Sequence, residues 1–141
     1  MYYKPLVLPL LAQVGLTFVV MFWMYSQRVA EFRQRGVHPE KTPTRRTARE
    51  VLKDSAGSAD NFMNLFETPV LFYTALLLAL VLLVNDFLLL QLAWLYVALR
   101  AIHSIIHCTY NGVMHRFYVF AASAVVLMGL WVRLAVVILV K

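Results

Sequence analysis

Four long apolar runs constrain this chain more than any other feature of its sequence. They cover residues 6–25, 62–84, 87–110 and 117–140. A helix of about 20 apolar residues crosses the hydrocarbon core of a membrane, so each run is long enough to span it. The spans must be helical because lipid offers no hydrogen-bond partners to backbone groups. The sequence therefore predicts an all-α, integral membrane four-helix bundle that forms a single domain over residues 1–141.

The composition argues against a water-soluble domain. Of the 141 residues, 62% are hydrophobic and only 14% are charged, whereas a soluble domain of this size needs more charge on its surface. The first run is predicted to be a permanent span rather than a cleaved signal peptide, because residues 24–27 lack the small residues of a cleavage site. Membrane lipids are therefore expected to surround most of the protein.

The connection between the first and second spans, residues 28–60, is strongly basic. By the positive-inside rule, this connection and the short turn before the fourth span face the cytoplasm, and both termini lie outside. The plain four-span layout, without an organelle-targeting signal, favours a bacterial inner membrane. The connection holds eight of the 13 lysine and arginine residues, namely Arg28, Arg33, Arg35, Lys41, Arg45, Arg46, Arg49 and Lys53.

Basic residues beside a membrane also attract anionic lipid headgroups. The charge of this connection therefore does not indicate a nucleic-acid partner. The main interpretation of this positive charge is that it sets the topology and attracts lipid. A role in substrate binding for an individual arginine of the connection stays open.

Local signals divide the connection further. The first helix is expected to continue to Arg35, and the two prolines of residues 36–43 mark a break after it. Residues 47–50 match a capping box and predict a short helix that runs to about Ser55. Residues 57–58, a glycine and a serine, are expected to form the turn into the second span.

Polar side chains inside the second and third spans fall on one face of each helix. Asn64 and Glu67 are three residues apart, and Arg100, His103 and His107 are spaced by three and four. Ionisable groups inside a membrane are costly, so they normally face the bundle interior and pair with one another. A rise of 1.5 Å per residue places both groups of side chains at similar depths in the cytoplasmic half.

This cluster carries more positive than negative charge. Glu67 faces two histidines and up to three arginines, because Arg28 and Arg116 lie at the cytoplasmic ends of the first and fourth spans. The excess favours an anionic ligand, since ionisable clusters inside membranes usually have a function. A structural cluster that only holds the helices together is the alternative.

The spacing of these polar residues resembles that of the MAPEG family, the membrane-associated proteins of eicosanoid and glutathione metabolism. The length, the four spans and the long basic connection extend the resemblance to the whole chain. The motifs that carry it are Asn64-x-x-Glu67-Thr-Pro69, Arg100-x-x-His103-x-x-x-His107 and Arg116.

The resemblance implies a homotrimer with active sites between subunits in the cytoplasmic half. It also implies a transferase or peroxidase reaction, with glutathione as co-substrate and a lipophilic electrophile that enters from lipid. Arg116 would be the catalytic residue that stabilises the thiolate, because nearby positive charge lowers the pKa of a thiol. The residues implied to bind glutathione are Arg28, Asn64, Glu67, Arg100, His103 and His107.

Several positions depart from the family pattern and keep other functions open. Asp60 and Met63 stand where the enzymes carry arginines. His107 and Phe120 replace tyrosines, and Phe117 replaces a serine that some members use in thiol activation. One alternative is a non-catalytic trimeric scaffold or lipid-binding protein of the same fold. Another is a small metal- or haem-binding bundle that uses the histidine pair, although an arginine on the same helix face disfavours a cation.

Overall fold

The computed structural model describes residues 5–140, and every regular element in that range is a helix. Taking α3 and α4 together, four helical segments of the described chain are long and apolar enough to cross a membrane. The predicted all-α membrane bundle is therefore confirmed. The elements are α1 (Val7–Arg35), the 3₁₀ helix η1 (Pro39–Lys41), α2 (Arg45–Val51), α3 (Ala56–Asn64), α4 (Thr68–Val81), α5 (Phe87–Cys108) and α6 (Val113–Leu139).

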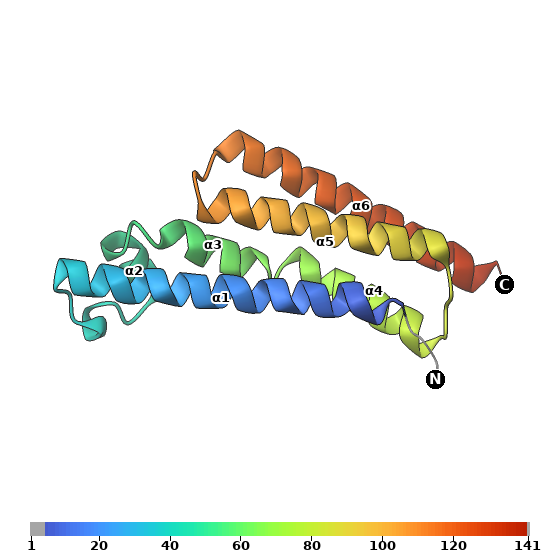
Figure 1. Cartoon of the computed structure of the whole chain (residues 1–141), viewed down its shortest axis with the longest axis horizontal. Coiled ribbons are helices and arrows are strands. Elements are labelled where there is room, and N and C mark those ends of the chain that lie inside the picture. The colour runs from blue at the N-terminus through green and yellow to red at the C-terminus, as the bar shows by residue number, and fades with distance from the viewer. Residues whose placement is uncertain (1–4, 141) are drawn as a thin grey trace.

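The long helices run along a common direction (Figure 1). Helices α5 and α6 lie antiparallel beside each other, and α1 runs along the other side of the bundle, in contact with α3, α4 and α5. The α1–α2 connection, α2 and the α5–α6 turn lie toward one end, which we call the basic end and which holds residues 36–55 and 109–112. The α4–α5 turn lies at the opposite end, as Figure 1 shows.

Apolar side chains form the core and also cover much of the outside. The core includes Phe72, Leu76, Tyr96 and Leu130, all fully buried, and the rings of Phe72 and Tyr96 stack with their centres 4.6 Å apart. Water-soluble proteins rarely expose large contiguous apolar surface, whereas lipid accommodates it. Exposed apolar side chains occur on every long helix, for example Phe22, Val81, Phe87, Ile105, Phe117 and Val132.

The helix expected through residues 62–84 is divided in two. Helix α3 ends at Asn64 and α4 begins at Thr68, with Pro69 in its first turn. A proline has no N–H to donate four residues back and its ring clashes with the preceding turn, so a regular helix is interrupted here. The first turn of a new helix tolerates proline well. The interruption matters for function because it changes the hydrogen bonding of the Asn64 carbonyl.

The capping box of α2 lies three residues earlier than predicted. The hydroxyl of Thr44 accepts the N–H of Thr47 at 3.2 Å, and the hydroxyl of Thr47 accepts the N–H of Thr44 at 3.1 Å. Thr47 is therefore the third residue of the helix rather than its cap. The helix also ends at Val51 instead of continuing to about Ser55. A threonine hydroxyl takes the role of the expected glutamate in this box.

Gly57 lies within α3 rather than in a turn, and its small size lets α3 approach the end of α5. A Cβ atom at this position would lie 3.0 Å from the carbonyl oxygen of His107 and 3.4 Å from the side-chain nitrogen of Asn111. The first distance is tighter than ordinary contacts of a Cβ atom. Glycine therefore permits the close packing of the start of α3 against the end of α5.

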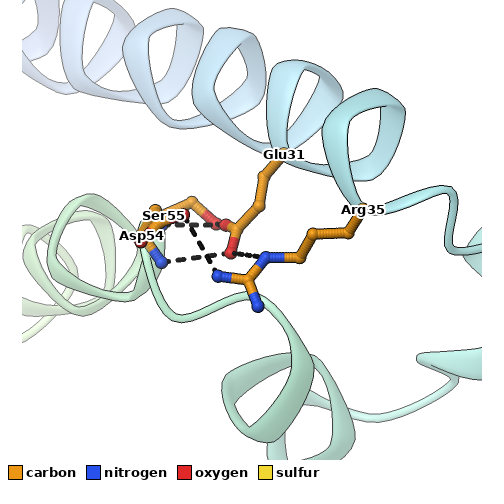
Figure 2. Close-up of polar contacts among 4 residues, drawn as sticks. All are labelled: Glu31, Arg35, Asp54 and Ser55. Atoms are coloured by element: carbon orange, nitrogen blue, oxygen red, sulfur yellow. Dashed lines mark hydrogen bonds and ion pairs between the residues drawn. The ribbon is translucent and has the colours of Figure 1, made fainter.

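A buried carboxylate on α1 anchors the basic connection, as Figure 2 shows. Glu31 is 2% exposed. It accepts the backbone N–H of Asp54 at 3.1 Å, and it accepts the N–H and the hydroxyl of Ser55 at 3.0 and 2.9 Å. Arg35, one turn later on α1, pairs with the same carboxylate at 2.9 Å. Glu31 therefore ties α1 to the segment that starts α3.

We expect Glu31→Gln to destabilise the protein. The substitution keeps the size of the side chain but removes the charge that Arg35 and the Ser55 donors share. Hydrogen bonds to charged groups contribute about 1.5–3 kcal/mol each, so a loss in this range is expected in the free energy of unfolding. Denaturant titration in detergent micelles measures it. The control is Glu50→Gln, because Glu50 forms an exposed pair with Arg46 whose loss costs about 0.5 kcal/mol or less.

A second ion pair fixes the end of the bundle opposite the basic end. Arg133 on α6 donates to Asp86 through Nε at 3.1 Å and through Nη2 at 2.6 Å. Asp86 also caps α5 by accepting the N–H of Leu89 at 2.8 Å. The hydrogen bonds from Arg133 hold the pKa of the Asp86 carboxyl below its usual range, with a smaller contribution from Leu89 and against the opposing effect of burial. The pair thus joins the start of α5 to α6.

This pair makes part of the stability dependent on pH. The folded protein lowers the pKa of Asp86, so the stabilisation is complete above the unfolded value of about 3.9 and is lost as the pH falls through the folded value. Asp86→Asn retains a good helix cap but removes the charge. We therefore expect the difference in unfolding midpoint between wild type and Asp86→Asn to be full above about pH 4 and to shrink below it. A difference that stays constant down to strong acid would contradict this account.

Candidate functional site

Within residues 5–140, two cavities with charged side chains in their lining lie toward the basic end of the bundle. The first, which we call the bundle cavity, has a volume of about 470 Å³. The second, which we call the loop cavity, lies between α1, α2 and α3 and has a volume of about 560 Å³. Arg49, Asp60 and Met63 line both cavities. The bundle cavity is lined by Arg49, Asp60, Met63, Asn64, Glu67, His103, His107, Val113, Arg116, Phe117 and Phe120.

The bundle cavity brings together five of the seven predicted site residues. Asn64 is the last residue of α3, and Glu67 lies in the break before α4. His103 and His107 come from the last turns of α5, and Arg116 comes from the first turn of α6. Side chains from three segments therefore meet at one level, as their spacing along the helices predicts.

Arg100, the sixth predicted residue, lies behind the wall of the bundle cavity. Its side chain is fully buried, and Nη2 donates to the carbonyl oxygen of Asn64 at 3.0 Å. The break between α3 and α4 leaves that carbonyl with only a 3.3 Å bond from the N–H of Glu67. The guanidinium carbon of Arg100 also lies 5.6 Å from the centre of the Phe120 ring. Within residues 5–140, Nε and Nη1 of Arg100 have no hydrogen-bond partner.

Glu67 and Arg100, which the sequence places in the same cluster, form no ion pair in the described chain. Glu67 is exposed although it lines the bundle cavity, while Arg100 is directed to a backbone carbonyl instead. The interruption of the helix before Pro69 explains both observations. It leaves the carbonyl of Asn64 available to accept a hydrogen bond from Arg100, and it directs Glu67 away from Arg100. The carboxylate of Glu67 is therefore left for another partner.

Arg116 is held in place by two side chains near the end of α5. Its Nη1 donates to Nε2 of His107 at 3.2 Å and to Oδ1 of Asn111 at 2.8 Å. A guanidinium group only donates hydrogen bonds, so Nε2 of His107 is the acceptor in this contact. The side-chain nitrogen of Asn64 approaches the same Nε2 at 3.5 Å. In residues 5–140, Nε and Nη2 of Arg116 bond to no protein group and are free for a ligand.

His103 supports the same arrangement from one turn earlier. Its Nδ1 donates to the carbonyl oxygen of Arg116 at 3.1 Å, which fixes the first turn of α6 against α5. Its Nε2 is buried and has no partner in the described part of the chain. The rings of His103 and His107 meet edge to face with their centres 5.5 Å apart. His103 therefore positions the backbone of Arg116, and His107 positions its side chain.

The formal charges that line the bundle cavity balance, which corrects the predicted excess of positive charge. Two arginines, Arg49 and Arg116, face two carboxylates, Asp60 and Glu67, and Arg49 forms an ion pair with Asp60. The excess that remains comes from Arg100 behind the wall. The difference arises because Arg28 and Arg100 do not line the bundle cavity, whereas the charges of Arg49 and Asp60, which do, cancel each other.

Comparison with known families shows where this arrangement belongs. The sequence profile of the MAPEG family matches residues 6–136, which is nearly the whole chain. The chain belongs to the MAPEG family. Searches of curated proteins and of solved structures gave no significant match.

The residues predicted to depart from the family pattern, namely Asp60, Met63, His107, Phe117 and Phe120, all line the bundle cavity. Met63, Phe117 and Phe120, together with Val113, form an apolar wall beside the polar groups of Asn64, His107 and Arg116. Asp60 and His107 lie among the polar groups of the cavity, so the predicted departures affect both its apolar and its polar side.

Arg28, the seventh predicted residue, lines the loop cavity instead of the bundle cavity. It lies on α1, and the residues common to both cavities, Arg49, Asp60 and Met63, stand between it and the bundle cavity. In a single MAPEG chain, Arg28 is therefore not gathered with the other predicted ligands.

Arg49 is a cavity residue that the sequence pattern did not single out. Helix α2 carries it, and its pairing with Asp60 places it on the wall that the two cavities share. The only signal for it was its membership of the basic connection, where a role for one arginine was left open. Among residues 5–140 of this MAPEG protein, no group of three or more His, Cys, Asp or Glu side chains is arranged to hold a metal ion.

Proposed function

We propose that this MAPEG protein binds glutathione in the bundle cavity and acts on lipophilic electrophiles as a glutathione-dependent transferase or peroxidase. The hydrogen bonding of Arg116 supports this proposal most strongly. Its Nη1 is fixed by His107 and Asn111, while the rest of the guanidinium group has no protein partner in the described chain. A charged fork that is held rigidly but not neutralised is suited to an anion.

The remaining groups of the cavity match the other parts of the tripeptide. Glutathione carries two carboxylates, one ammonium group and one thiol, so it requires partners of both signs. Arg49 would contact a carboxylate, and Asp60 and Glu67 would accept hydrogen bonds from the ammonium group. The amide of Asn64 would bond to the peptide backbone. The balanced charges of the lining therefore suit a zwitterionic ligand.

Arg116 would stabilise the thiolate form of the bound ligand. Nearby positive charge lowers the pKa of a thiol, and the thiolate is the nucleophile. In the transferase reaction, the thiol proton leaves to water and the sulfur lone pair forms a bond to the electrophilic carbon of the second substrate. That carbon either releases a leaving group with its electron pair, or the electron pair of one of its bonds moves to a neighbouring atom, which then takes up a proton. The second substrate would lie on the apolar wall of Val113, Phe117 and Phe120.

We further propose that the protein is a homotrimer in a bacterial inner membrane, with the basic end in the cytoplasm. Glu67 and Phe117 line the bundle cavity yet are exposed in one chain, so a neighbouring copy could cover them and complete the site. The positive-inside rule supports the orientation.

Isothermal calorimetry of the detergent-purified protein with glutathione tests the proposal. We expect saturable heat at millimolar ligand or below, and a weaker response to a peptide of the same length in which serine replaces the cysteine. Glu67→Gln should weaken binding, whereas Glu50→Gln, an exposed change outside the cavity, should not. Absence of heat at millimolar glutathione would contradict the proposal.

One observation favours a second candidate, a trimeric scaffold without catalytic activity. Arg49 is already paired with Asp60, and Arg100 is bonded to a backbone carbonyl, so part of the polar cluster is satisfied within the chain. A scaffold would show no thiol-dependent turnover but would lose its assembly when Glu67 is changed. Size-exclusion chromatography of Glu67→Gln, alongside the calorimetry, separates the two functions.

A further inference from the structure

The loop cavity is more basic than the bundle cavity. Four arginines line it, Arg28 from α1 and Arg45, Arg46 and Arg49 from α2, whereas Asp60 is its one carboxylate within the described chain. The predicted glutathione ligands other than Arg28 lie outside it. The charge of this cavity therefore requires an explanation of its own.

Two of these arginines have no acidic partner among residues 5–140. Arg49 pairs with Asp60 and Arg46 pairs with Glu50, but no carboxylate pairs with Arg28 or Arg45. The Nε of Arg28 is also buried without a hydrogen-bond acceptor. Buried polar groups in folded proteins are normally hydrogen-bonded, so an orphaned guanidinium nitrogen indicates that an acceptor belongs here.

The position of the cavity along α1 specifies which acceptor is available. Arg28 follows Val7, the first residue of α1, by 21 residues, which is about 32 Å of helix. The hydrocarbon core of a membrane is about 30 Å thick. Arg28 therefore lies at the level of the lipid headgroups on the basic side.

The rest of the lining combines with the arginines to suit a lipid. Met24, Leu52 and Phe62 supply apolar surface beside the guanidinium groups, and Tyr25 is exposed at the edge, with 55% of its surface accessible. Guanidinium groups match the geometry of phosphate oxygens. Tyrosine is common at the interface between membrane and water. A soluble anion would use the arginines but not the apolar wall.

We propose that the loop cavity binds the phosphate group of an anionic phospholipid from the surrounding membrane. Arg28 and Arg45 hold the phosphate oxygens, and the acyl chains leave the cavity past Tyr25 and Phe62. The bound lipid fixes α2 against α1 and α3. This assignment is independent of the proposed glutathione function, because it uses a different cavity.

The test is native mass spectrometry of the delipidated, detergent-solubilised protein with added phosphatidylglycerol, phosphatidylcholine or inorganic phosphate. We expect saturable binding of one phosphatidylglycerol per chain, with phosphatidylcholine and inorganic phosphate binding at least about tenfold more weakly. Arg28→Gln and Arg45→Gln should each weaken phosphatidylglycerol binding about tenfold or more, since each removes a charge-assisted contact.

Arg33→Gln is the matched control, because Arg33 is an exposed arginine on the same helix that does not line the cavity. It should bind phosphatidylglycerol like the wild type. An equal loss in Arg33→Gln would show diffuse attraction and overturn the proposal. Equal binding of phosphatidylcholine would overturn the requirement for an anionic lipid, and equal binding of inorganic phosphate would assign the cavity to a free anion. Arg45 lies on an exposed helix, so its variant provides a test even if Arg28→Gln does not fold.

Discussion

Arg116→Ala should reduce the affinity for glutathione by about tenfold to a hundredfold. The substitution removes the guanidinium nitrogens that have no protein partner, and hydrogen bonds between charged groups contribute about 1.5–3 kcal/mol each. It also leaves Nε2 of His107 and Oδ1 of Asn111 without the donor they share. Calorimetry with glutathione measures the affinity, and turnover of a lipophilic electrophile should fall at least as far because the thiolate loses its counter-charge.

Arg133→Ala is the matched control for this prediction. Arg133 lies on the same helix as Arg116 but pairs with Asp86 at the opposite end of the bundle. It should lower stability without changing the affinity for glutathione. Equal loss of affinity in the two variants would show that general damage to α6, rather than the contact of Arg116 with the ligand, explains the effect.

Arg100→Met should stabilise the unliganded protein and weaken its binding of glutathione. Arg100 is fully buried and makes one hydrogen bond, to the Asn64 carbonyl, while two of its nitrogens have no partner within residues 5–140. An arginine at the centre of a membrane helix costs about 2.5–3.5 kcal/mol on insertion scales. Replacing poorly paired buried charges with apolar groups often stabilises a protein by about 1–4 kcal/mol. We expect a gain near the lower limit, because the Asn64 carbonyl loses a donor.

The loss of binding in Arg100→Met follows from the charge of the site. The groups that line the bundle cavity carry balanced charges, so Arg100 supplies the positive field behind it. Removing that field should weaken the binding of an anionic ligand about tenfold or more. Arg100→Lys retains the charge and should keep much of the affinity. Thermal unfolding and calorimetry on the same samples test both effects, and a variant that is less stable but binds normally would contradict the interpretation.

The helices and the meeting of the polar residues follow from local rules that operate along one helix. Apolar runs of sufficient length define the spans because membrane-spanning segments have a fixed minimum length. The spacing of Arg100, His103 and His107 places them on one face, and the direction of each helix brings Asn64 and Arg116 to their level. These relations require no knowledge of tertiary contacts.

The features that the sequence did not predict depend on contacts between segments far apart in the chain. Glu31 caps a segment 23 residues later, and Arg49 is drawn to the cavity wall by Asp60 from α3. Neither residue belongs to a motif, and charged residues in a basic connection resemble a solvated surface. The break before Pro69 was visible in the sequence, but its consequence, the bond from Arg100 to Asn64, depends on how α5 packs against that break.

The most direct test of the central claim is the ionisation of glutathione bound to the detergent-purified protein. Ultraviolet difference spectroscopy at a pH well below the pKa of the free thiol detects the thiolate. We expect a thiolate signal that saturates with glutathione in the wild type, persists in Arg133→Ala and is lost in Arg116→Ala. Bound glutathione that remains a thiol, or a thiolate that forms equally well without Arg116, would contradict the account.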